Sequence, residues 1–168
     1  MARLYLMLGY PGAGKTTAAN VISQLTGATH LSSDILRATM FNPPQFSQQE
    51  HDSLYDTLDR QTERFLREGK DVIYDANLNR KQHRQDKYEI CQRTGSIPVL
   101  LWVQTPKNLA KDRALDINRS QLIPRDETAD QMFDRIVSII EEPSNDEPYT
   151  SIDGTKIKPK YIRQLLNL

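Results

Sequence analysis

Near its start the chain interrupts its most apolar run with a segment rich in glycine. The run Leu4 to Leu8 has the composition of a buried strand, and residues 16–22 have the pattern of a helix. Between them, Gly9 to Thr16 reads GYPGAGKT, which fits G-x-x-x-x-G-K-[ST] at every position. A strand, a glycine turn and a helix in this order predict a phosphate-binding loop (P-loop), which constrains the fold more than any other feature of the sequence.

The residue types of this loop suit a triphosphate. Glycines permit a tight turn and let backbone N–H groups approach an oxyanion, and the helix that follows adds its dipole. Lys15 is expected to reach the β- and γ-phosphates and to act in catalysis, while Thr16 would place its hydroxyl on Mg²⁺. ATP and Mg²⁺ are therefore the expected cofactors. The residues expected to hold ATP in the loop are Gly12, Ala13, Gly14, Lys15, Thr16 and Thr17.

The order of apolar runs predicts the fold class. Runs suited to strands occur at Leu4–Leu8, Val72–Tyr74 and Ile97–Val103, with a weaker one at Ala28–Leu31, and helical patterns separate them. Alternation of this kind predicts an α/β fold of three layers, with a mostly parallel sheet flanked by helices. The length fits one domain over residues 1–168.

Cap residues mark several helices. Ser47 to Glu50 reads SQQE, a capping box, and the helix that follows should end near Gly69. Thr105 and Pro106 suit the cap and first turn of another helix. Residues 141–149 are expected to form a loop.

Composition excludes several classes of protein. Basic and acidic residues are balanced at 22 each, although four basic residues follow the last acidic one, so no overall field favours a nucleic acid or a membrane. The single cysteine, Cys91, has no partner for an internal disulfide. No signal-peptide pattern and no apolar run of membrane-spanning length occur. A soluble cytoplasmic protein is expected.

Other short motifs separate the classes of P-loop protein. The N-K-x-D stretch that usually gives guanine specificity does not occur, and Asp75 at the end of DVIYD is followed by Ala76 rather than by a glutamate that could activate water. A GTPase and a motor ATPase are therefore disfavoured. The remaining class passes the γ-phosphoryl group to an acceptor and needs a group that draws off the acceptor's proton.

The stretch HLSSDILRATM supplies such a group. Asp34 follows the weak second strand, at the edge of the sheet where ligands of open α/β folds bind, and Arg37 lies one helical turn further on. A carboxylate base beside an arginine makes a sensible acceptor site. The alternative is that Ser33 or Asp34 caps the helix at residues 35–40 and pairs with Arg37 on its surface.

Taken together, these motifs resemble a known family. The P-loop, SSDILR, VIYDANLNRKQHR, an arginine-bearing helix and IPRDE follow one another as in the P-loop kinases that include the kinase domain of polynucleotide 5′-hydroxyl kinases and the zeta-toxin-like kinases. The resemblance covers roughly residues 4–140, and D-x-N-L-N at Asp75–Asn79 is its most family-like part.

The resemblance implies roles for individual residues. Asp34 would be the general base and Arg37 would hold the acceptor's phosphate, while Asp75 would orient Arg37 or the water shell of the metal. Arg113 would lie over the nucleotide. Arg119 is the nearest match to a second, catalytic lid arginine, although it follows Arg113 by six residues where the family pattern has four.

A lid is also expected from the residues themselves. Residues 116–125 read DINRSQLIPR, a polar loop within a lid of roughly 114–126, whose closure would exclude water from the transfer. Further along the family-like stretch, Arg80, Arg84 and Lys87 share a helical face, which would either track a polynucleotide backbone or be solvated. The histidines show no metal-binding spacing.

The sequence therefore favours an ATP-dependent kinase acting on a hydroxyl, with a polynucleotide 5′ end as the preferred acceptor. The alternative is a kinase of a small molecule or nucleotide, because HLSSDILRA also resembles the monophosphate-binding stretch of adenylate kinases. A third hypothesis, less favoured, is a binding module that uses ATP to order its lid for a protein partner.

Overall fold

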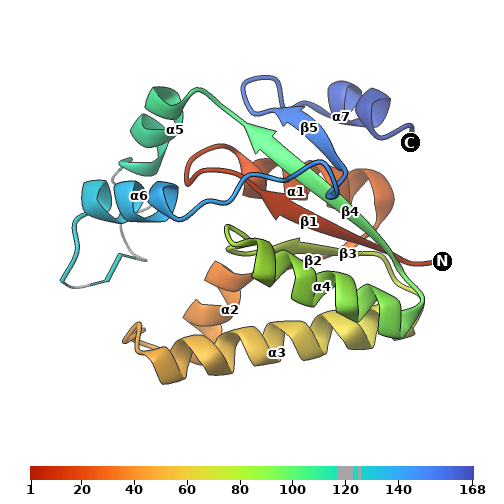
Figure 1. Ribbon diagram of the computed structural model, residues 1–168, viewed down its shortest axis with the longest axis horizontal. Coiled ribbons are helices and arrows are strands. Elements are labelled where there is room, and N and C mark those ends of the chain that lie inside the picture. Colours follow the sequence, from red (N-terminus) through yellow and green to blue (C-terminus); the bar gives the residue numbers. More distant parts are fainter. Residues whose placement is uncertain (117–122, 125) are drawn as a thin grey trace.

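Five parallel strands form the centre of the protein. The computed structural model describes residues 1–116, 123–124 and 126–168. The strands are β1 (Arg3–Leu8), β2 (Thr29–Ser32), β3 (Val72–Asp75), β4 (Ile97–Gln104) and β5 (Tyr149–Asp153). They lie in the order β2-β3-β1-β4-β5, and every pairing is parallel (Figure 1). The predicted three-layer α/β fold is confirmed.

Helices cover both faces of this sheet. The helices of the described residues are α1 (Lys15–Thr26), α2 (Ser33–Met40), α3 (Gln48–Arg67), α4 (Lys81–Thr94), α5 (Lys107–Ala114), α6 (Ala129–Ser138) and α7 (Pro159–Leu165). None of them is long and apolar enough to cross a membrane.

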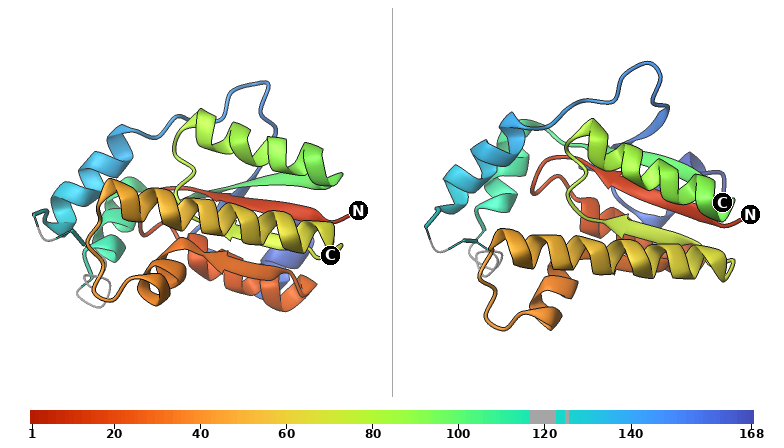
Figure 2. Two further views of the ribbon diagram at one scale, coloured as in Figure 1. Left: turned by 90° about the horizontal axis from the view of Figure 1, so that it is seen from below. Right: turned by 60° about the horizontal axis from the view of Figure 1, so that its bottom comes forward.

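Alternation along the central strand explains the layers. Leu4, Leu6 and Leu8 of β1 pack in a cluster with α3 and α4, whereas Tyr5 and Met7 pack with α1 and α7. Successive side chains of a strand point to opposite faces, so a strand that is apolar at every position must be covered on both. Figure 2 shows α3 and α4 on one side of the sheet, and α5 and α6 lie together beyond the carboxyl ends of the strands.

Parallel register brings the ends of two strands together. Ser32, the last residue of β2, is level with Asp75, the last residue of β3, and β1 runs beside β3 into the P-loop. The sheet therefore gathers the P-loop, Asp75 and the start of α2 at one edge, as expected for ligand sites of open α/β folds.

Two details differ from the expectations. β5 was not predicted and begins at Tyr149, the last residue of the expected loop; of its five residues only Ile152 is buried, which leaves little apolar signal. Thr105 does not cap α5, since its hydroxyl donates instead to the carbonyl of Ala13 in the P-loop at 2.8 Å. The predicted helix start is otherwise correct.

Candidate active site

The P-loop needs glycine at positions that no other residue could occupy. Gly12 and Gly14 have φ angles of 76° and 109°, in the left-handed region that L side chains rarely adopt. A Cβ on Gly12 would lie 2.1 Å from the carbonyl oxygen of Ala110 in α5, and one on Gly14 would lie 2.7 Å from Ile157. The loop is therefore wedged between α5 and the segment after β5.

Lys15 closes the loop from its other side. Its ammonium donates to the carbonyl oxygens of Gly9 and Tyr10, each at 2.9 Å. The ammonium expected to meet the β- and γ-phosphates is thus hydrogen-bonded to the backbone of the loop itself. Arg113, expected over the nucleotide, donates to the carbonyl of Gly154, in the segment packed against the loop, at 3.2 Å.

Two polar side chains contact the same oxygen of Asp75 beside the P-loop. The hydroxyl of Thr16 donates to Oδ2 of Asp75 at 2.8 Å, and Nε2 of His30 lies 3.0 Å from the same oxygen. A hydroxyl beside a carboxylate supplies the hard oxygen donors that Mg²⁺ prefers, so Thr16 and Asp75 fit the expected metal. No group of three or more His, Cys, Asp or Glu side chains in the described part of the chain forms a metal site of its own.

The start of α2 places Asp34 at the same edge. Ser32, rather than Ser33 or Asp34, caps this helix, because its hydroxyl accepts the N–H of Ile35 at 3.4 Å. The predicted alternative of a cap at Ser33 or Asp34 is wrong in this respect, so the carboxylate of Asp34 is not used to cap the helix.

The surroundings of Asp34 raise its proton affinity. The side chain is accessible to solvent but has protein atoms on most sides. Desolvation and the negative charge of Asp75 raise the pKa of this carboxyl, while Lys15 and Arg37 act in the opposite direction. A carboxylate that binds a proton more readily than usual is suited to accept one from a hydroxyl.

Arg37 is held by a partner that the sequence analysis missed. Its guanidinium donates to Glu50 at 2.6 Å and lies 5.0 Å from the ring centroid of Phe46. Glu50 also accepts the backbone N–H of Gln45 at 2.7 Å. Arg37 is therefore paired with Glu50, whereas Asp75 contacts Thr16, and the roles predicted for Asp75 stay predictions.

The capping box explains why Glu50 was overlooked. Ser47 accepts the backbone N–H of Glu50 at 3.1 Å, as the SQQE pattern predicts. The carboxylate, which should complete the box at the backbone of Ser47, is instead used for Arg37 and Gln45. A pattern that explains a residue locally can conceal a long-range partner.

The side chain of Tyr55 connects the two segments that flank Asp34. Its hydroxyl accepts the backbone N–H of Asn77 at 3.3 Å and is hydrogen-bonded to the side chain of Ser33. The His51 ring packs beside the Tyr55 ring, with 4.5 Å between centroids. The first turns of α3 thus lie against the start of α2 and the loop after β3.

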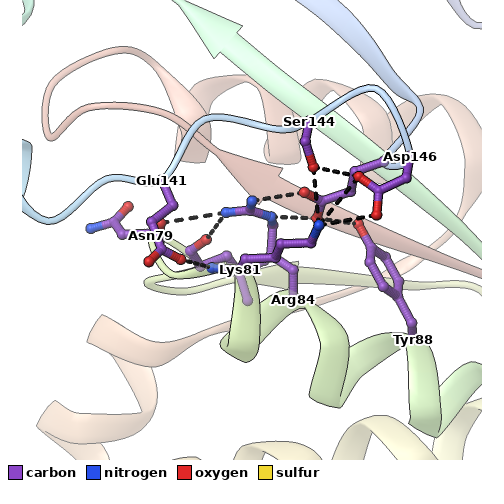
Figure 3. A network of polar contacts seen from close by, with 9 residues as sticks. Asn79, Lys81, Arg84, Tyr88, Glu141, Ser144 and Asp146 are labelled. Atoms are coloured by element: carbon purple, nitrogen blue, oxygen red, sulfur yellow. Dashed lines mark hydrogen bonds and ion pairs between the residues drawn. The ribbon is translucent and has the colours of Figure 1, made fainter.

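The predicted basic face at α4 is lost at two of its three residues, and only Arg80 is exposed. Arg84 is fully buried and forms an ion pair with Glu147, and Lys87 is also buried and pairs with Asp59. Figure 3 shows Arg84 directed from α4 toward the loop that precedes β5. Both expectations for Arg84 and Lys87, contact with a polynucleotide and a solvated face, are wrong because distant carboxylates compensate their charges inside the protein.

Most of the lid predicted from the sequence belongs to residues that the structure does not describe. Arg119, expected to be catalytic, and Arg125 lie outside the described residues, as does most of the expected lid at 114–126. On the described side, α6 lies close to the P-loop, since the rings of Tyr10 and Phe133 meet edge to face at 6.4 Å.

Fold and site together define a nucleotide-binding P-loop protein with the architecture of the kinases. The chain matches the family described as an AAA domain over residues 4–139, and it belongs to that family. No curated protein sequence matches the chain.

Solved structures show the same fold. A putative kinase from Chloroflexus aurantiacus superposes with a TM-score of 0.78 at 16% identity, over 99% of this chain and 97% of that one. The APS kinase CysC of Mycobacterium tuberculosis, solved with AMPPNP and APS, gives 0.71 at 14% identity, over 99% and 96%. At such identities the likeness establishes the fold, and the expected kinase-type fold is confirmed.

The structural match that bears on the predicted polynucleotide kinase covers a smaller part of the matched chain. A chain of the Pnkp1/Rnl/Hen1 RNA repair complex superposes with a TM-score of 0.66 at 15% identity, over 82% of this chain but 44% of that one. Small-molecule kinases share the fold over a larger part of their length.

Proposed function

We propose that the protein is an ATP-dependent phosphotransferase that passes the γ-phosphoryl group to an acceptor hydroxyl. The observation that carries the proposal is the gathering of the P-loop, the Thr16–Asp75 pair and Asp34 at one sheet edge. A nucleotide-binding loop alone needs no carboxylate of raised pKa beside it. A transferase needs one as the base.

Each residue has a part in the reaction. The amides of Gly12 to Thr17 and the ammonium of Lys15 would bind the phosphates, and Thr16, with Asp75 through water, would hold Mg²⁺. Bound magnesium neutralises charge on the β- and γ-phosphates. As the acceptor oxygen bonds to the γ-phosphorus, its proton passes to Asp34, and the bond to the β-phosphate oxygen breaks to release ADP.

Arg37 would orient the acceptor beside Asp34. The ion pair with Glu50 and the ring of Phe46 fix the guanidinium one helical turn from the base. Arg113, and Arg119 of the lid, are proposed to cover the nucleotide and the transferring group, and such a cover would keep water from competing with the acceptor.

The proposal has two versions, which differ in the acceptor of the phosphoryl group. A polynucleotide 5′-hydroxyl, preferred from the sequence, remains a prediction. The burial of Arg84 and Lys87 removes the basic track that supported it and favours a small hydroxyl-bearing acceptor. The third hypothesis, a binding module ordered by ATP, predicts tight nucleotide binding with no transfer.

A label-transfer assay tests the proposal. The protein is mixed with [γ-³²P]ATP and Mg²⁺ and with a 5′-hydroxyl oligonucleotide, nucleoside monophosphates, sugars or amino sugars in separate reactions. Label should appear in one acceptor class, and Asp34→Asn should reduce the rate by about 100-fold or more because the base is lost. Nucleotide affinity, measured by calorimetry, should stay unchanged.

Asp56→Asn is the matched control, because Asp56 is exposed on α3 and pairs only with the neighbouring Arg60 among described residues. Its rate should equal that of the wild type. Full transfer by Asp34→Asn would exclude Asp34 as the base. Tight ATP binding with no label in any acceptor would favour the binding module instead.

A further inference from the structure

Four side chains next to the P-loop form a circuit of polar contacts, which consists of Thr16, Asp75, His30 and Asn20. Thr16 and Asn20 lie four residues apart on α1 and therefore on the same helix face. Thr16 donates to Oδ2 of Asp75, the same oxygen lies 3.0 Å from Nε2 of His30, and Nδ1 of His30 lies 3.1 Å from Oδ1 of Asn20. The circuit begins and ends on α1 and crosses β3 and β2.

The sheet register makes this circuit possible. His30 is level with Ile73, two residues before Asp75. Residues two apart on a strand point to the same face, and paired residues of neighbouring strands share it. Ile73 packs in the cluster that includes α1, so His30 and Asp75 both face α1. The side chain of His30 is only 14% exposed, which keeps its bond to Asp75 largely out of competition with water.

Thr16 and His30 both contact this oxygen of Asp75, and of these two only His30 keeps a position that does not depend on the metal. The hydroxyl of Thr16 would become a magnesium ligand, so its position depends on whether metal and nucleotide are bound. His30 is held on its other side by Asn20 and has no such dependence. A carboxylate near a metal is oriented by its outer hydrogen-bond partners, and their loss typically costs about 10- to 100-fold in metal affinity or activity.

We propose that His30 is a positioning residue that fixes the Asp75 carboxylate for the magnesium–nucleotide complex. The inference rests on the nucleotide and metal part of the proposed function and not on phosphoryl transfer. The simpler possibility, that His30 only fastens the edge strand β2 to α1, makes a different prediction. It would affect folding and the binding of all nucleotides alike, whereas a positioning role concerns only binding that involves the metal.

Calorimetric titration of the whole chain with ATP separates these roles. Each variant is measured once with excess Mg²⁺ and once with EDTA. In His30→Leu the affinity measured with Mg²⁺ should fall by about 10-fold or more, and that measured with EDTA should stay within twofold of the wild type. His30→Gln, which can donate one N–H to Asp75, should recover part of the loss, and Asn20→Ala should give a smaller loss.

Each outcome of the titrations either supports or overturns the positioning role of His30. Equal losses with Mg²⁺ and EDTA, or no loss in either, would overturn the positioning role. If His30→Leu proves unfolded by circular dichroism, His30→Gln and Asn20→Ala carry the same test, because the first keeps a polar group beside Asp75 and the second keeps the imidazole but removes its outer partner. The assay contains no acceptor, so failure of phosphoryl transfer cannot be mistaken for failure of this inference.

Discussion

Arg84 and Glu147 form a buried ion pair that joins α4 to the loop before β5. Nε and Nη2 of the guanidinium donate to the two carboxylate oxygens at 2.5 and 2.8 Å, and Nη1 donates to the carbonyl of Leu78 at 3.0 Å. The backbone N–H of Glu141 reaches the carbonyl of Asn79 at 2.7 Å, as part of the same network (Figure 3). The segment between α6 and β5 is thus fastened to the family-like loop after β3.

Substitution of Glu147 by glutamine should destabilise the fold strongly. Arg84 would keep its charge in the interior without a charged partner, which typically costs about 3–5 kcal/mol. Urea unfolding followed by circular dichroism measures the change. Asp146→Asn is the control, because Asp146 belongs to an exposed pair with Lys81 and its loss should leave the midpoint nearly unchanged. Equal midpoints for the two variants would contradict this account of Arg84.

The same carboxylate should contribute to unfolding in acid. Burial acts to raise the pKa of Glu147, but hydrogen bonds from Arg84 and Tyr88 outweigh it and hold the pKa below the ordinary value of 4.5. The stabilisation is therefore present above pH 4.5 and is lost as the pH falls through the folded-state pKa. Stability measured from pH 7 to 3 should fall less steeply in Glu147→Gln than in the wild type. A parallel decline would show that other groups control the acid transition.

The rate of transfer should follow the ionisation of Asp34. Because desolvation and Asp75 raise the pKa of this carboxyl, the rise of kcat/KM with pH should be centred above the ordinary value of 3.8. Arg37 lowers this pKa, so Arg37→Gln should move the rise to higher pH. A profile of kcat/KM against pH for both proteins measures the shift. Movement toward lower pH would exclude Asp34 as the titrating group.

Loss of the Glu50 carboxylate should disturb the acceptor side alone. In Glu50→Gln the guanidinium of Arg37 loses its ionic partner, and small displacements of positioning groups can cost up to about 100-fold in rate. The value of kcat/KM for the acceptor should fall while KM for ATP stays constant. Substrate kinetics with each substrate varied in turn provides the measurement, and a change in KM for ATP alone would contradict the assignment.

Gly12 offers a test of the P-loop geometry with an internal control. Gly12→Ala places a Cβ 2.1 Å from the carbonyl of Ala110, so the loop or α5 must shift and ATP binding should be lost. Gly95 has a similar φ of 66° but open space around it. Gly95→Ala should therefore cost only the backbone penalty of about 1–2 kcal/mol and bind ATP normally. Equal ATP affinity in both variants, measured by calorimetry, would refute the packing argument.

Local patterns predicted the parts of the site that lie within one segment. The P-loop could be located from its own eight residues because strand, turn and helix adjoin, and Asp34 could be placed because it follows a strand. The three-layer α/β fold with a parallel sheet followed from the alternation of strands and helices. In each case the physical cause lies within a few residues of the effect.

The remaining features depend on partners far away in the sequence. Arg84 meets Glu147 across 63 residues, and nothing near Arg84 distinguishes a buried guanidinium from a solvated one. His30 has no motif spacing, and its contact with Asp75 arises from the register of β2 against β3. β5 is a short edge strand with one buried side chain, so its sequence resembles a loop.

The hydrogen bonds of Lys15 have a consequence for how a nucleotide enters. The ammonium already rests on two carbonyl oxygens, so an arriving phosphate must displace them rather than meet a waiting charge. Lys15 therefore contributes to binding only the difference between its charge-assisted bonds to the phosphate and its present bonds to these carbonyl oxygens. The rest of the binding free energy has to come from the backbone amides of the loop and from the magnesium ion.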